Sequence, residues 1–112
     1  ICVGSDTSPY AIVEEYNGTA WTTATAYPST PSSAMRSTGL TQDATLAWHL
    51  GTAATYNGTA WTAQGGLSNP RQSAGAAGSS SAGLAMGGVP NTTSTEEFTG
   101  PGAPVTKTIT TS

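Results

Sequence analysis

Short apolar runs recur along the chain, and residues rich in Gly, Ser and Pro separate them. The runs at 44–50 and 82–86 have the length and the Gly or Ser boundaries of buried inner strands, and the run at 1–4 also predicts a strand. Residues 105–110 alternate large and polar side chains with a period of two, which is typical of a strand with one apolar face. No stretch keeps apolar residues at helical spacing, so the pattern predicts an all-β fold with almost no helix.

One segment of seven residues occurs twice. Residues 16–22 read Tyr-Asn-Gly-Thr-Ala-Trp-Thr, and the same residues return at 56–62 with a period of 40. The Asn-Gly pair supplies the two positive φ angles of a type I′ hairpin turn, so Tyr and Trp are expected to face each other across each hairpin. A degraded copy of the opening lies at 96–100, and 46–51 has an echo at 84–88. The chain is therefore expected to be a single domain of repeated β units.

The marks of this repeat support a family resemblance. They are the two Tyr-to-Trp hairpins, a glycine pair and a later aromatic residue, namely Tyr16, Trp21, Tyr56, Trp61, Gly87, Gly88 and Phe98. The pattern resembles kelch-type repeats, and more narrowly the Gly- and Ala-rich kelch-like arrays of tail-fibre and virion structural proteins of marine bacteriophages. The resemblance implies that each repeat is one four-stranded blade of a β-propeller. It divides the chain into a half-blade at 1–18, repeats at 19–58 and 59–100, and a C-terminal closing strand at 101–112.

About two blades and two half-blades do not close a propeller, which needs about four to eight blades. We therefore expect the fold to be closed by oligomerisation, with a homotrimer of six blades favoured over a dimer of four or a tetramer of eight. The strands at 1–4 and 105–110 are expected to complete a blade that is shared between protomers. An open stack in a larger fibre is the alternative.

Composition narrows the class of partner. The 112 residues carry a formal net charge of -3, and only 8% are charged. The three basic residues, Arg36, Arg71 and Lys107, cannot form a phosphate-binding stripe, so no nucleic-acid partner is expected. No run approaches the roughly 20 apolar residues of a membrane-spanning helix, so no membrane partner is expected either. The only cysteine, Cys2, is expected to be a small buried hydrophobe.

Residues suited to catalysis are scarce. One His, one Cys and six carboxylates are too few for the convergent clusters of acid–base or metal chemistry, so no catalytic residue, metal or cofactor is expected. His49 is expected to lie at a strand end with a satisfied hydrogen bond. The pairs Glu14-Glu15 and Glu96-Glu97 raise the question of a calcium site. Protection of sheet edges by charge is the favoured explanation for both pairs.

Exposed aromatic side chains are the natural platforms on which sugars stack. Outside the repeated hairpins these are Tyr10, Tyr27 and Trp48. They are the candidate ligand-binding residues, although core packing is favoured for each. Trp21 and Trp61 are expected to be structural pins of the blades, and binding specificity is expected on the loops at 27–34 and 90–95.

The sequence thus predicts a non-enzymatic structural and attachment protein of a virus particle, located in the virion or outside the cell. As a phage tail-fibre or appendage component, it would present a β-propeller surface to a host-surface glycan or to other virion proteins. The alternative is an extracellular filament whose terminal half-blades join neighbours by strand exchange. An enzyme of the galactose-oxidase or sialidase type is disfavoured, because one histidine does not supply the copper ligands of galactose oxidase.

Overall fold

The computed structural model describes residues 1–4, 8–29, 35–89 and 93–99, and the backbone of 105–108. These residues form strands and no helix, which confirms the predicted all-β class. The strands are β1 (Cys2–Val3), β2 (Val13–Tyr16), β3 (Trp21–Thr23), β4 (Arg36–Thr41), β5 (Ala44–His49), β6 (Thr52–Tyr56), β7 (Trp61–Gln64), β8 (Gly75–Gly78), β9 (Gly83–Met86), β10 (Ser94–Phe98) and β11 (Val105–Thr108).

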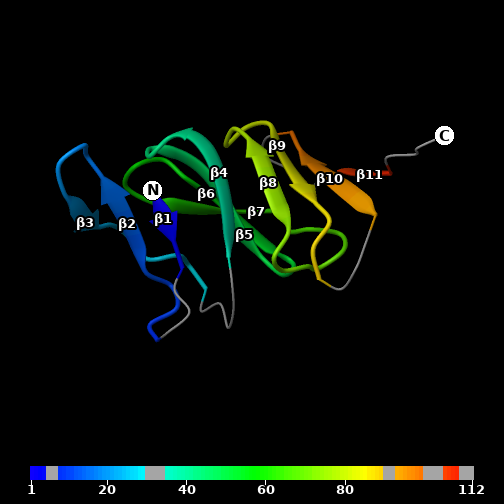
Figure 1. The fold of residues 1–112 in the computed structure, drawn as a ribbon, viewed down its shortest axis with the longest axis horizontal. Coiled ribbons are helices and arrows are strands. Elements are labelled where there is room, and N and C mark those ends of the chain that lie inside the picture. Colours follow the sequence, from blue (N-terminus) through cyan, green and yellow to red (C-terminus); the bar gives the residue numbers. More distant parts are fainter. Residues whose placement is uncertain (5–7, 30–34, 90–92, 100–104, 109–112) are drawn as a thin grey trace.

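The strands build three antiparallel sheets that follow one another along the chain (Figure 1). The first sheet has the order β1-β2-β3, the second β4-β5-β6-β7 and the third β11-β10-β9-β8. Each strand pairs with its neighbours in sequence, so every sheet is a meander. β11 pairs with β10, so it completes the third sheet of its own chain. The described residues form no closed ring of sheets.

Equivalent positions of the sequence repeat occupy equivalent places in the sheets. The strand register pairs Cys2 with Glu14 in the first sheet, Ala47 with Ala54 in the second, and Ala85 with Glu96 in the third. The sheets are offset from the repeat units at 19–58 and 59–100, because the hairpins at 16–21 and 56–61 each lie within one sheet. The part of the chain that the structure describes therefore holds one three-stranded and two four-stranded sheets.

The hydrophobic core lies between successive sheets. The cluster at the junction of the first and second sheets consists of Val13, Tyr27, Met35, Ala47 and Ala54. The cluster at the junction of the second and third sheets consists of Leu46, Trp48, Ala53, Ala85 and Phe98. Successive residues of β5 thus belong to opposite junctions, as the alternation of side chains along a strand requires. This position between two sheets explains why β5 is buried almost throughout.

The turns of the two repeated hairpins differ from the predicted type I′ turn. Gly18 and Gly58 have positive φ angles of +97° and +94°, whereas neither Asn17 nor Asn57 does. In each hairpin the Asn side-chain oxygen instead accepts hydrogen bonds from the backbone N–H groups two and three residues later, at 2.8 to 3.0 Å. A four-residue loop closed by the Asn side chain results. The predicted facing of Tyr and Trp is confirmed in both hairpins.

Two expectations about burial are wrong. β5 is buried as predicted, but β9 alternates buried and exposed residues, with Leu84 and Met86 exposed. No sheet of the described chain covers that side of the third sheet. Cys2 is exposed rather than buried, because its side of the first sheet likewise has no neighbouring sheet among the described residues.

Candidate functional site

A buried ion pair fixes the connection between the second and third sheets. Arg71, between β7 and β8, places its Nη2 2.7 Å from Oε2 of Glu96 on β10, and the side chains are 1% and 0% exposed. The carboxylate also accepts hydrogen bonds from the backbone N–H groups of Ser68 and Asn69. The guanidinium donates to the backbone oxygens of Asn69, Gly87 and Ser94 and to the Ser94 hydroxyl. The pair therefore ties residues 68–71 to the interior of the third sheet.

The role of the repeated carboxylates differs from the sequence-based expectation. β2 lies between β1 and β3, and β10 lies between β9 and β11, so both Glu-Glu pairs lie on central strands. Edge protection is therefore the wrong explanation. Glu96 is the buried partner of Arg71, while Glu15 lies beside Tyr56. Burial, and then a hydrogen bond and the charge of the Glu15 carboxylate, raise the pKa of Tyr56.

Trp61 connects the first sheet to the second. Its indole Nε1 donates a hydrogen bond of 2.8 Å to the backbone oxygen of Thr25. Its ring meets Tyr27 edge-on at 5.1 Å between centroids and lies 4.8 Å from Tyr56. Trp61 thus lies at the junction of the first two sheets, and its role as the pin of a propeller blade stays a prediction. Trp21, its repeat counterpart, is exposed and stacks at 5.2 Å on Tyr16, so it pins no junction of the described chain.

The three candidate ligand-binding aromatic residues differ in burial. Tyr27 and Trp48 are buried in the two core clusters, which confirms the favoured packing role, and burial raises the pKa of Tyr27. Tyr10 is exposed. His49 lies buried at the end of β5, as expected, and burial lowers its pKa. Of the loops expected to carry specificity, residues 30–34 and 90–92 lie outside the described residues.

The glycine pair that follows β9 in the third sheet has a local structural role. Gly87 and Gly88 both have positive φ angles, +63° and +104°. A Cβ atom on Gly88 would lie 2.7 Å from the backbone oxygen of Gln72, so only glycine allows this approach. The pair thus positions the end of β9 beside the segment that follows Arg71.

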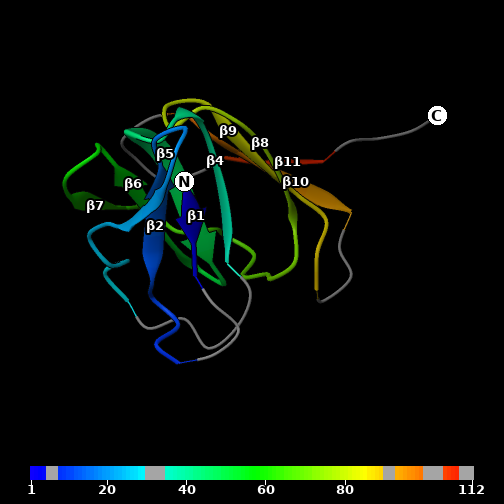
Figure 2. The ribbon, with the colours of Figure 1, turned by 60° about the vertical axis from the view of Figure 1, so that its left-hand side comes forward.

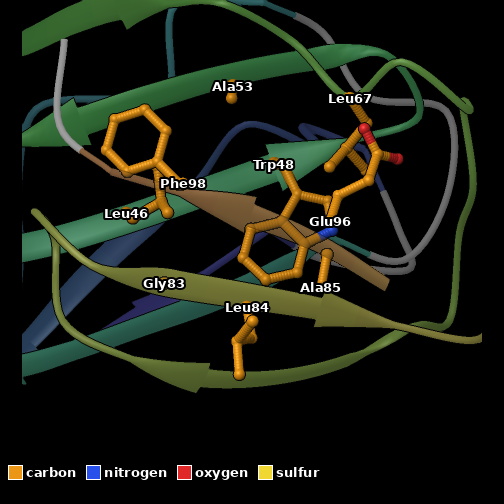
Figure 3. A pocket seen from close by; sticks show the side chains of 9 residues that line it. All are labelled: Leu46, Trp48, Ala53, Leu67, Gly83, Leu84, Ala85, Glu96 and Phe98. Carbon is orange, nitrogen blue, oxygen red and sulfur yellow. The ribbon is translucent and has the colours of Figure 1, made fainter. Parts of the chain in front are cut away.

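A small cavity lies between the second and third sheets, next to the carboxylate of Glu96 (Figure 3). Its lining is mostly apolar and comes from β5, β9 and β10, with Leu46, Trp48, Ala85 and Phe98 among the residues around it. Its volume of about 10 Å³ is at the lower limit for one water molecule. The cavity is therefore a packing defect of the core and not a ligand site.

A larger groove opens at the outer end of the same junction. Its volume is about 260 Å³, slightly below the range of pockets that hold drug-sized ligands. Most of the lining residues are polar, although apolar atoms supply most of the lining surface. The residues are Asp43, Ala44, Thr55, Tyr56, Asn57, Thr62, Gln64, Ser80, Ser81 and Phe98. Hydroxyl and amide groups with a single carboxylate suit a neutral, hydroxylated ligand of the size of one sugar ring. None of the three candidate aromatic residues lines this groove.

Other site types are not seen in the described part of the chain. It contains no group of three or more His, Cys, Asp or Glu side chains able to hold a metal ion. No helix long and apolar enough to cross a membrane occurs in the same residues. Comparison with models of known protein families, with curated proteins and with solved structures finds no match.

Sequence reasoning missed the contact between Arg71 and Glu96. A signal was present, since Glu96 occupies the repeat position of Ala54 in the middle of an apolar junction. A carboxylate at such a position needs a cation or several N–H donors. The sequence has only three basic residues, but no pattern in it brings Arg71 next to a strand 25 residues later.

Proposed function

We propose that this chain is a non-enzymatic structural and attachment module of a bacterial virus particle, in which each sheet acts as one blade of a kelch-like β-propeller. The observation that carries the proposal is the repeated packing of sheet on sheet through equivalent residues, such as Ala47 and Ala85. A structure of this kind extends by the addition of further sheets, as blades and solenoid repeats do. The resemblance to phage fibre arrays supports the assignment to the virion.

The groove between the second and third sheets is the surface that we propose for attachment. Its polar groups come from separate parts of the two sheets: Asp43 lies in the β4–β5 turn, Gln64 on β7 and Ser81 in the β8–β9 turn. The packing of the two sheets brings them together. Gln64 is oriented by a 3.0 Å hydrogen bond from its amide to the Thr55 hydroxyl. A host-surface glycan with neutral sugar units is the ligand class that this lining suits.

The structural part of the proposal is tested on virus particles. Antibodies raised against the chain are expected to label tail fibres or appendages of purified particles in electron micrographs. Mass spectrometry of the same particles should detect the chain among the virion proteins. Its absence from purified particles would overturn the assignment.

The attachment part is tested with a glycan array and two matched variants. Ser81→Trp places a large ring in the groove, whereas Thr19→Trp places the same ring on the exposed turn of the first hairpin. We expect the wild-type chain and Thr19→Trp to bind the same neutral glycans, and Ser81→Trp to lose that binding. Equal binding by all three proteins would show that the groove is not the site.

A further inference from the structure

The second sheet is covered on both faces by its neighbours. Ala47, Ala54 and Tyr56 lie on the side of the first sheet, and we call this surface the leading face. Leu46, Trp48 and Ala53 lie on the side of the third sheet, and we call this surface the trailing face. At the second junction, the trailing face of one sheet thus packs against the leading face of the next, which Ala85 and Phe98 form.

The leading face of the first sheet has the same aromatic pair as that of the second, with Glu14 at the position of Ala54, and no sheet of the described residues covers it. Tyr16 opposes Trp21 there, as Tyr56 opposes Trp61 in the second sheet. Tyr16 is 46% exposed where Tyr56 is 3% exposed, and Trp21 is 54% exposed. Cys2, at the position of the buried Ala47, is exposed as well. Figure 2 brings this side of the molecule forward, and no other sheet of the described chain lies in front of it.

The trailing face of the third sheet is uncovered in the same way. Leu84 and Met86 occupy the strand positions that Leu46 and Trp48 hold in the second sheet. They are 36% and 37% exposed, whereas both Leu46 and Trp48 are 3% exposed. In Figure 3 the side chains of Leu84 and Ala85 lie on opposite sides of β9. Large apolar side chains therefore lie exposed at both ends of the row of sheets.

We infer that the trailing face of the third sheet binds the leading face of the first sheet in a second copy of this chain. The new junction repeats the internal one: Leu84 and Met86 of one copy pack on Cys2 and Tyr16 of the next, as Leu46 and Trp48 pack on Ala85 and Phe98. The partner is a second copy because the described residues carry both complementary faces. Such a contact joins two different surfaces and is heterologous.

A heterologous contact builds a ring when its rotation closes and a stack when it does not. The described residues of each chain form three sheets, so two copies supply six, within the roughly four to eight blades of closed propellers. Three copies would supply nine. The favoured closed assembly is therefore a ring of two copies and not the trimer expected from a count of two blades. The open stack is the other assembly that the same junction can build.

The test disables one face at a time. Trp21→Glu places a charge on the leading face and Leu84→Glu places one on the trailing face. Leu40→Glu is the matched control, because Leu40 is an exposed leucine on β4 away from both faces. Light scattering and native mass spectrometry measure association of the full chain, and circular dichroism checks that each variant keeps the wild-type β spectrum.

The wild type and Leu40→Glu are expected to associate. Trp21→Glu and Leu84→Glu are each expected to remain at the 11.2 kDa monomer mass, because the dissociation constant of the junction should rise by at least about tenfold. Mixing the two face variants restores one intact junction, so a 1:1 complex should form and grow no further. In that mixture Cys2 of the Leu84→Glu chain should also become protected from a thiol reagent.

Two results would overturn the inference. A wild-type chain that stays monomeric at all accessible concentrations would show that the exposed faces do not bind each other. Self-association of Leu84→Glu alone would show a contact between like faces. Neither result bears on the proposed attachment function, because glycan binding and incorporation into particles are measured separately.

Discussion

Replacement of Glu96 by Ala tests whether the buried ion pair holds the third sheet in place. The substitution leaves the guanidinium of Arg71 in the interior without its counter-charge, and also removes the acceptor of the Ser68 and Asn69 N–H groups. Removal of one partner from a buried pair costs about 3–5 kcal/mol. The lost backbone acceptors place the expected value in the upper half of that range, about 4–5 kcal/mol.

A loss of that size is a large part of the roughly 5–15 kcal/mol by which small domains are stable. The assay is equilibrium unfolding in urea, followed by tryptophan fluorescence, because Trp48 lies in the core cluster of the same junction. Glu97→Ala is the matched control, since it removes a carboxylate from the next position of the same strand, where the side chain is only half-buried. That control is expected to cost less than about 1 kcal/mol.

A double mutant separates the pair from its surroundings. Arg71→Met alone leaves the Glu96 carboxylate without its cation, whereas Arg71→Met combined with Glu96→Ala leaves no buried charge. The double mutant should therefore be about 2 kcal/mol more stable than the sum of the single losses predicts. A cost below about 1 kcal/mol for Glu96→Ala, or additivity within about 0.5 kcal/mol, would refute the reasoning.

Three further substitutions probe the turns and the aromatic junction. Gly18→Ala and Gly58→Ala both place a side chain at a positive φ, which should lower the free energy of unfolding by about 1–2 kcal/mol. The loss measured by urea unfolding should be larger for Gly58→Ala, because its Cβ would lie 2.8 Å from Asp43 in the β4–β5 turn, whereas no atom lies within 4 Å of a Cβ at Gly18. Burial raises the pKa of Tyr27 above 10.0, so the neutral phenol stabilises the folded state. This contribution to stability is complete below pH 10 and is lost as the pH rises through the raised pKa. Tyr27→Phe should therefore reduce the loss of stability at alkaline pH, measured by urea unfolding on both sides of pH 10. Trp61→Phe removes a hydrogen bond between the second sheet and the segment that follows β3, and should lower the free energy of unfolding by about 1 kcal/mol. Trp21→Phe should change the free energy of unfolding by less than about 0.5 kcal/mol at low protein concentration.

Some of the strands and the pairing within the two repeated hairpins could be predicted because they depend on local patterns, whereas β4 and β8 were not predicted. Residues 44–50 and 82–86 contain β5 and β9, and both repeated hairpins have the predicted facing of Tyr and Trp. The predicted turn type was wrong because the Asn side-chain oxygen accepts backbone hydrogen bonds that favour another turn conformation than the type I′ turn usual for Asn-Gly. Asn17 closes its loop by accepting two backbone hydrogen bonds, which requires positive φ only at Gly18.

Burial could not be predicted, because the same local sequence lies in different surroundings along the row of sheets. Leu46 and Leu84 belong to similar segments, yet one is covered by the next sheet and the other is exposed. The partner of Glu96 was missed for a related reason. Arg71 lies in an irregular segment between two sheets, where no periodic pattern fixes its position.

The distribution of burial also determines which parts of the molecule depend most on a partner. A sheet of three or four strands needs a packed face for stability, and the second sheet has two such faces while the first and third have one each. The third sheet compensates with the pair of Arg71 and Glu96, which anchors β10 to residues 68–71. The first sheet has no buried ion pair among the described residues. Its connection to the second consists of the core cluster around Val13, the aromatic packing of Trp61, and the hydrogen bonds of Trp61 and Thr25. The first sheet is therefore the one that a second copy would stabilise most, because binding to the folded state alone shifts the folding equilibrium in proportion to partner concentration.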